Sequence, residues 1–177
     1  MKVLGLNGSP RKGGNTDSLM DALFAKARHN GHRVEKVYLG DLRIGPCVDC
    51  RACKKEPFEC VLSDGMREIY SRIDDADILV FGTPIYWFGP TGPMKTLVDR
   101  LRPYVANHNL RGKRALLVAQ AGDGPGDADL TVEMFRRSLA YLEVDLSGNV
   151  LGTAYDRGDI LADTEAMAKA AALGASL

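Results

Sequence analysis

The fold of this chain is decided by the stretch Val3-Leu-Gly-Leu-Asn-Gly-Ser-Pro-Arg-Lys-Gly-Gly-Asn-Thr16, in which a short apolar run enters a glycine-rich segment. The run from Val3 to Leu6 predicts a buried strand, and the helical periodicity of residues 16–28 predicts a helix. Glycines let the backbone between them curl, and a helix N-terminus offers a positive end to an anion. The stretch therefore predicts a strand-loop-helix unit whose loop binds a phosphate group.

The candidate phosphate ligands lie in the segment from Gly8 to Thr16. Gly14 of the same segment is also a candidate cofactor-binding residue. Ser9, Asn15 and Thr16 can hydrogen-bond phosphate oxygens, and Arg11 can neutralise a dianion. The motif GxxxxGK(S/T) fails because Gly13 is followed by Gly14 and Asn15, and GxGxxG fails on glycine spacing, so nucleotide hydrolysis and a Rossmann dinucleotide site both lose support. An ordinary glycine-rich turn with Asn15 as a helix cap stays open as the structural alternative.

The rest of the chain repeats this alternation of apolar runs and helical periodicity. Further strands are expected at residues 33–39, 78–81, 115–120 and about 144–151. Further helices are expected at residues 66–73, 94–101, 127–142 and 164–173, with Gly174 as the last C-cap. Five such units predict one domain over residues 1–177: a three-layer, doubly wound α/β fold with a parallel five-stranded sheet in the order 2-1-3-4-5.

The site of such a sheet lies beyond the carboxyl ends of its strands. The charged run at 33–39 is placed at a sheet edge, whereas 78–81 and 115–119 are continuously apolar and buried on both faces. The loops after strands one, three and four are therefore expected to build the site together.

The loop after the third strand, residues 82–93, carries Tyr86, Trp87 and Phe88 among glycines and prolines. Such a sequence suits a planar ligand, although the aromatic side chains could equally cap the sheet or lie in a subunit interface. The glycine-rich loop after strand four, which includes Gly122, could close the other side of the ligand.

Composition limits the classes of partner. The number of Lys and Arg residues equals the number of Asp and Glu residues, at 23 each. The chain therefore has no net charge that would attract it to nucleic acid or an anionic membrane. The apolar run at the amino end is too short for a signal peptide, and no stretch is long enough to span a bilayer. We expect a cytoplasmic protein whose partner is a small molecule or another protein.

All four cysteines lie between Cys47 and Cys60, in a cysteine-rich loop at residues 45–63. In a reducing compartment, such a group argues for metal or redox chemistry before disulfides.

The segments Gly8 to Thr16, Thr83-Pro-Ile-Tyr-Trp87 and Pro93-Met-Lys-Thr-Leu-Val-Asp-Arg100 together resemble the NADPH-dependent FMN reductase family of flavodoxin-like proteins. The likeness covers most of residues 1–120. It implies that FMN is the cofactor and NAD(P)H the electron donor. By the same resemblance, the phosphate is held by Ser9, Arg11, Asn15 and Thr16, and the isoalloxazine ring by Pro84, Ile85, Tyr86 and Trp87.

The cysteines, spaced as Cys47-x2-Cys50-x2-Cys53-x6-Cys60, resemble the motif of the iron-sulfur flavoproteins. That resemblance implies a 4Fe-4S cluster with the four thiolates as ligands. The motif differs from the bacterial ferredoxin motif in the six residues before its last cysteine. It also lacks the two separated C-x-x-C pairs of a zinc ribbon. Unligated thiols and a zinc site stay open beside the cluster.

Three functions follow as hypotheses. The first is an enzyme in which bound FMN passes electrons from NAD(P)H to a flavin, quinone or similar acceptor, without a catalytic side chain. The second is an electron carrier that uses FMN and a 4Fe-4S cluster with ferredoxin-like partners. The third is a colourless module that binds a phosphorylated ligand. In the family that the chain resembles, the pocket is completed across subunits, so a homodimer or homotetramer is expected.

Overall fold

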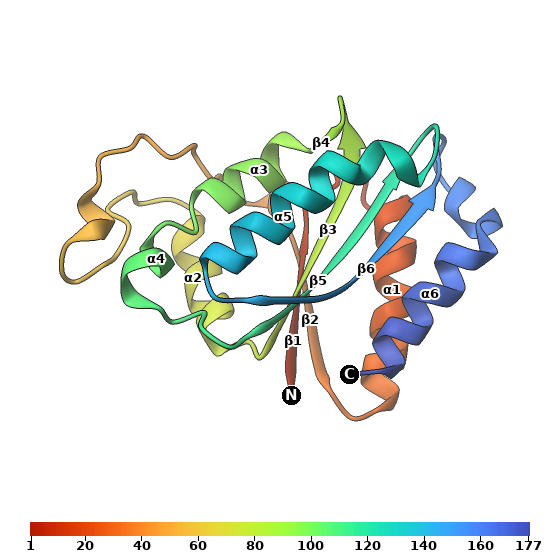
Figure 1. Ribbon diagram of the computed structural model, residues 1–177, viewed down its shortest axis with the longest axis horizontal. Helices are drawn as coiled ribbons and strands as arrows, with labels where there is room; N and C mark the ends of the chain where they lie inside the picture. The colour runs from red at the N-terminus through yellow and green to blue at the C-terminus, as the bar shows by residue number, and fades with distance from the viewer.

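The computed structural model describes residues 1–177 and contains a parallel sheet in the order β2-β1-β3-β5-β6 (Figure 1). Its strands are β1 (Lys2–Asn7), β2 (Arg33–Tyr38), β3 (Ile78–Tyr86), β5 (Arg114–Ala121) and β6 (Asp145–Thr153). This is the predicted order 2-1-3-4-5, with the charged strand β2 at an edge. An additional two-residue strand, β4 (Gly89–Pro90), pairs antiparallel with the end of β3.

Helices cover both faces of the sheet and enclose two separate cores (Figure 1). One face is covered by α1 (Asn15–His29) and α6 (Thr164–Ala175), and the other by α2 (Met66–Asp75), α3 (Gly92–Asp99) and α5 (Asp129–Tyr141). Neighbouring residues of one strand point to opposite cores, as Val3 and Leu4 do. None of the helices is both long and apolar enough to cross a bilayer.

Three expectations for these elements were wrong. Strand β3 does not end at Phe81 but continues to Tyr86, because it pairs with β1 as far as Gly82, with β5 as far as Pro84 and with β4 over its last two residues. The helix expected at 94–101 is α3, which ends at Asp99, and a separate short helix, α4 (Pro103–Asn107), follows it. Gly174 is not a C-cap but lies within α6.

Gly174 is required by helix packing. A Cβ atom at this position would lie 2.0 Å from the backbone oxygen of Leu23 in α1. The glycine therefore lets α6 approach the backbone of α1 directly.

The cysteine-rich loop has no strand and only one short 3-10 turn, Ala52–Lys54. In Figure 1 it projects as the orange segment at the left, away from the tip formed by β3 and β4. The chain therefore carries two candidate sites at different places on the fold.

Candidate functional site

A cavity of about 500 Å³ lies at the carboxyl ends of β1, β3, β5 and β6. Eight of the ten predicted cofactor-binding residues line it: Ser9, Arg11, Asn15, Pro84, Ile85, Tyr86, Trp87 and Gly122. The two that do not are Gly14 and Thr16, which are buried behind the loop. Thr16 instead donates a hydrogen bond of 3.1 Å to Gln120 Oε1 and so connects α1 to β5.

The cavity is also lined by seven residues that were not predicted to bind the cofactor: Phe88, Gln120, Ala121, Asp123, Asp127, Ala154 and Tyr155. The last two follow β6, whose loop carries no glycine-rich or aromatic motif strong enough to mark it. The ring of Tyr155 lies against Gly122, where an added Cβ would come within 2.8 Å of Tyr155 Cδ2. The need for glycine at 122 is thus set by a residue 33 positions later in the printed sequence.

The end of the cavity where a phosphate is predicted to bind is the first turn of α1. The backbone N–H groups of Asn15, Thr16 and Asp17 have no acceptor within the chain, and the capping residue, Gly14, has no side chain to supply one. Arg11 is exposed and forms no ion pair. Free N–H groups at a helix N-terminus beside an unpaired cation fit an anion such as a phosphate monoester.

Asn15 differs from its predicted role, because its amide is engaged by the chain itself. Its Oδ1 accepts a hydrogen bond of 2.8 Å from the backbone N–H of Gly158, and its Nδ2 donates one of 2.8 Å to the carbonyl oxygen of Asp156. The side chain therefore fastens the loop after β6 to the phosphate loop. Its backbone N–H stays free, and the alternative that Asn15 caps the helix is wrong because Gly14 is the cap.

The opposite end of the cavity is the β3-β4 hairpin. Trp87 and Phe88 form its tip with φ angles of 51° and 62°, a backbone region that non-glycine residues rarely adopt. The Trp87 side chain is 96% exposed and those of Tyr86 and Phe88 are about half exposed. The aromatic side chains thus line the cavity mouth without filling it, and they are not packed as caps of the sheet.

The four cysteines line a second, much smaller cavity together with Arg100 and Arg102. Cys53 is buried and Cys50 is exposed. No three Cys, His, Asp or Glu side chains of the chain are close enough together to hold a metal ion as they stand. The structure therefore brings the sulfur atoms to one place but not to ligand spacing.

Arg100 is the buried cation of this second site, with only 1% of its side chain exposed. It donates hydrogen bonds of 2.7 Å to Gly45 O and to Asp64 Oδ2, and one of 3.4 Å to Cys60 Sγ. Its Nε is the one buried side-chain polar atom of the chain without a partner. The guanidinium lowers the pKa of the Asp64 carboxyl, while burial raises the pKa of the Cys53 thiol.

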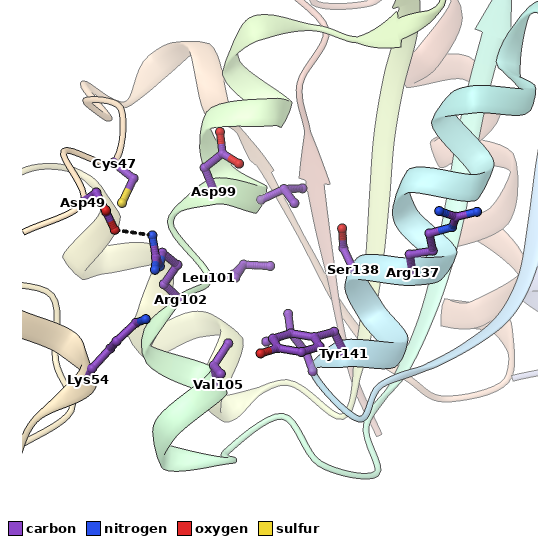
Figure 2. A pocket seen from close by; sticks show the side chains of 12 residues that line it. Cys47, Asp49, Lys54, Asp99, Leu101, Arg102, Val105, Arg137, Ser138 and Tyr141 are labelled. Atoms are coloured by element: carbon purple, nitrogen blue, oxygen red, sulfur yellow. Dashed lines mark hydrogen bonds and ion pairs between the residues drawn. The ribbon is translucent and has the colours of Figure 1, made fainter. Parts of the chain in front are cut away.

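A wider groove of about 740 Å³ lies between α5 on one side and α4 with part of the cysteine-rich loop on the other (Figure 2). Tyr141 of α5 faces Val105 of α4 across it, and Arg102 forms an ion pair of 2.6 Å with Asp49 at its side. None of the residues predicted to bind FMN lines this groove, and Cys47 alone of the four cysteines does. The larger opening is therefore separate from the predicted FMN site, although part of the cysteine-rich loop lines it.

Comparison with known proteins gives the family context. The family described as NADPH-dependent FMN reductase matches residues 1–153. An iron-sulfur flavoprotein of Archaeoglobus fulgidus is 36% identical over 70% of this chain, which spans 56% of that protein's length. The iron-sulfur flavoprotein MJ1083 of Methanocaldococcus jannaschii is 34% identical over 89% of this chain and 81% of its own.

A Bacillus subtilis protein named as an NAD(P)H-dependent FMN-containing oxidoreductase, YwqN, is 33% identical over 98% of this chain and 96% of its own. Among solved structures, the Trp repressor binding protein from Bacillus subtilis has a TM-score of 0.73 at 27% identity, covering 98% of this chain and 99% of its own. The NAD(P)H:quinone oxidoreductase from Methanothermobacter marburgensis has a TM-score of 0.80 at 20% identity, covering 99% and 95%, and supports the fold alone. The predicted flavodoxin-like fold is confirmed.

Proposed function

The chain belongs to the NADPH-dependent FMN reductase family, and from this premise we propose that it binds FMN in the 500 Å³ cavity and passes electrons from NAD(P)H to a small acceptor. The observation that carries the proposal is the meeting of residues 9–15 and 84–87 at that one cavity. These two segments are the ones expected from sequence to hold the phosphate and the ring. Bound FMN supplies hydride acceptance and electron release, and the protein supplies binding and orientation.

The phosphate end has what a phosphate monoester needs. Three unbonded N–H groups, those of Asn15, Thr16 and Asp17, offer hydrogen bonds, and Arg11 offers an unpaired positive charge. Ser9 Oγ accepts from the backbone N–H of Arg11 at 3.2 Å, and its hydroxyl donates a long hydrogen bond of 3.5 Å to Arg11 O, which it can exchange for an anion oxygen.

The ring end offers a slot between two loops. Pro84 and Ile85 form one wall at the end of β3, and Gly122 and Tyr155 form the other. Aromatic and small residues on both sides suit a planar ligand, which they would hold below the mouth at Trp87. We propose a planar acceptor, such as a flavin or a quinone, because it can enter this mouth.

No side-chain acid or base is assigned to the reaction. The three histidines lie outside the cavity, and His108 is paired at 2.9 Å with Glu143 on the surface. The residues of this chain therefore bind, orient and exclude water, while the redox step belongs to the cofactor.

The direct test is to record the visible spectrum of the purified protein with FMN and to add NADPH or NADH without oxygen. We expect about one FMN per chain, bleaching by a reduced nicotinamide, and recovery when a quinone or free flavin is added. A protein that binds no FMN at saturation, or bound FMN that neither nicotinamide reduces, would overturn the proposal. The latter outcome with a bound cluster would favour the electron-carrier function.

A 4Fe-4S cluster at the cysteine-rich loop is a second candidate, favoured by a specific observation. Cys47, Cys50, Cys53 and Cys60 line one cavity beside the buried Arg100, whose Nε is unpartnered. A buried cation with a spare donor suits the charge of a cluster held by thiolates. The loop would have to close around the cluster, and it has few regular hydrogen bonds to prevent this.

The cluster candidate is tested by anaerobic purification or reconstitution, followed by iron, acid-labile sulfide and zinc analysis. About four iron and four sulfide per chain, reduced in Cys53→Ser while FMN is retained, would support it. FMN without iron or sulfide would overturn the cluster and leave the reductase function intact. Zinc without sulfide would assign the loop to a zinc site.

We also propose that the protein is a cytoplasmic homodimer or homotetramer. The support is the exposed aromatic mouth, where Trp87, Phe88 and, on the adjoining helix, Leu130 present apolar surface. Light scattering of the FMN-bound protein tests the assembly: a monomer at every concentration would contradict it. A small molecule or a ferredoxin-like protein remains the proposed electron acceptor.

A further inference from the structure

Asp17 is a buried carboxylate directly behind the phosphate loop, with 2% of the residue exposed. Its Oδ2 accepts a hydrogen bond of 2.5 Å from the backbone N–H of Gly13, and its Oδ1 accepts one of 2.9 Å from Asn7 Nδ2. Asn7 Oδ1 in turn accepts a hydrogen bond of 2.8 Å from the backbone N–H of Ser9. One carboxylate thus holds both limbs of the loop, near its beginning and near its end.

Two side chains of the edge strand β2 compensate the buried charge. Lys36 Nζ lies 2.8 Å from Asp17 Oδ1, and the Tyr38 hydroxyl lies 3.0 Å from the same oxygen and 3.1 Å from Oδ2. Burial alone would lower the pKa of Lys36, but its hydrogen bonds to Asp17 and Asp21 raise the pKa above the usual value. Lys36 therefore stays charged near neutral pH, and it is hydrogen-bonded to the buried carboxylate.

These contacts decide which N–H groups remain for a ligand. Gly13 has a φ of 64°, and its N–H is turned inward to Asp17. The next three helical N–H groups, at residues 15–17, are left without acceptors. A carboxylate at this place also repels a phosphate. Removing its charge would therefore strengthen FMN binding if electrostatic repulsion dominates, and would weaken it if ordering of the loop dominates.

We propose that Asp17 is a positioning residue that fixes residues 8–14 in the phosphate-binding conformation and so strengthens FMN binding through the phosphate group alone. The inference rests on the proposed function, namely that the adjoining cavity binds FMN. Loop ordering exceeds charge repulsion because Lys36 offsets the charge, whereas no other side chain holds both Gly13 and Asn7.

The test compares FMN with riboflavin, which has the same ring and no phosphate. Dissociation constants for both are measured by flavin fluorescence in the wild-type protein and in Asp17→Asn. We expect FMN to bind at least about tenfold more weakly to the variant, while riboflavin stays within about twofold. The matched control is Asp21→Asn, because exposed Asp21 contacts the same Lys36 at 2.7 Å and does not reach the loop; it leaves both constants unchanged.

Each other result contradicts the inference. Equal losses for FMN and riboflavin would mean that Asp17 supports the fold in general, and tighter FMN binding would mean that charge repulsion dominates. If Asp17→Asn does not fold, Tyr38→Phe removes one hydroxyl from the carboxylate and is expected to show a smaller loss confined to FMN. A wild-type protein that binds neither flavin would instead refute the proposed function.

Discussion

Thr91 Oγ1 donates a hydrogen bond of 2.7 Å to the backbone carbonyl oxygen of Gly8. The same threonine donates from its backbone N–H to Thr83 Oγ1 at 3.1 Å, and all three residues are buried. Gly8 begins the phosphate loop, whereas Thr83 and Thr91 flank the hairpin at the ring end. This relationship ties the two ends of the cavity to each other.

Thr91→Val removes this link with little change in shape. We expect a loss of about 1–3 kcal/mol in the free energy of unfolding, because a buried carbonyl oxygen loses its partner and α3 loses its cap at Met94 N. Urea unfolding measures it. The control is Thr96→Val in the same helix, whose hydroxyl makes no hydrogen bond; equal effects of the two variants would contradict the assigned role.

Arg11→Gln tests the cation at the phosphate end. We expect FMN affinity to fall by about tenfold and its salt dependence to become shallower, because an exposed ion pair is screened by salt. Riboflavin affinity should not change. Lys12→Gln is the control, since neighbouring Lys12 is paired with Asp41 at 2.7 Å. Loss of riboflavin and FMN affinity together would count against a phosphate role for Arg11.

Asp64→Asn tests the buried pair beneath the cysteine-rich loop. The Asp64 carboxyl has a pKa below its unfolded value of about 3.9, chiefly through its hydrogen bonds to Arg100. Its stabilising effect is therefore present above about pH 4 and lost as pH falls through the lower folded-state pKa. At pH 7 we expect the variant to lose about 3 kcal/mol, because Arg100 is left buried and uncompensated.

The measurement for Asp64 is unfolding free energy against pH. The difference in unfolding free energy between the wild type and Asp64→Asn should decrease below about pH 4. Asp99→Asn, which breaks the exposed pair with Lys95, should cost no more than about 0.5 kcal/mol and is the control. A gap that stays constant on acidification would contradict the linkage.

Gly174→Ala tests the contact between α6 and α1. Because the new methyl would meet Leu23 O at 2.0 Å, we expect a loss of about 3 kcal/mol, despite the higher helix propensity of alanine. Thermal unfolding measures it. Gly40→Ala, where nothing lies within 4 Å, is the control. A stabilised Gly174→Ala protein would show that the helices separate easily.

Much of the fold follows from local pattern. The apolar runs at 78–81 and 115–119 identify buried parallel strands, and the charges of β2 place it at the edge. What the sequence misses depends on distant contacts. The role of Gly174 is set by a backbone oxygen of α1, and the extension of β3 is set by its pairing with β1, β5 and β4.

The cavity-lining residues that the sequence predicted are those in short segments of recognisable composition. Residues near Ser9 and Ile85 stand in segments whose composition identifies them, and they line one cavity, although Ile85 lies at the end of β3 and not in a loop. Tyr155 was not predicted, because the loop after β6 carries no motif that marks it, although the predicted sheet order places that loop beside the one containing Gly122. The engagement of Asn15 by the loop after β6 was likewise invisible from the sequence, since its partners are more than 140 positions away.

The central claim is tested most directly by titrating the flavin-free protein with FMN and counting bound flavin per chain, before and after anaerobic addition of NADPH. The account expects saturation at about one FMN per chain, with preference for FMN over riboflavin, and loss of the oxidised-flavin absorption on NADPH addition. Absence of saturable FMN binding would contradict it.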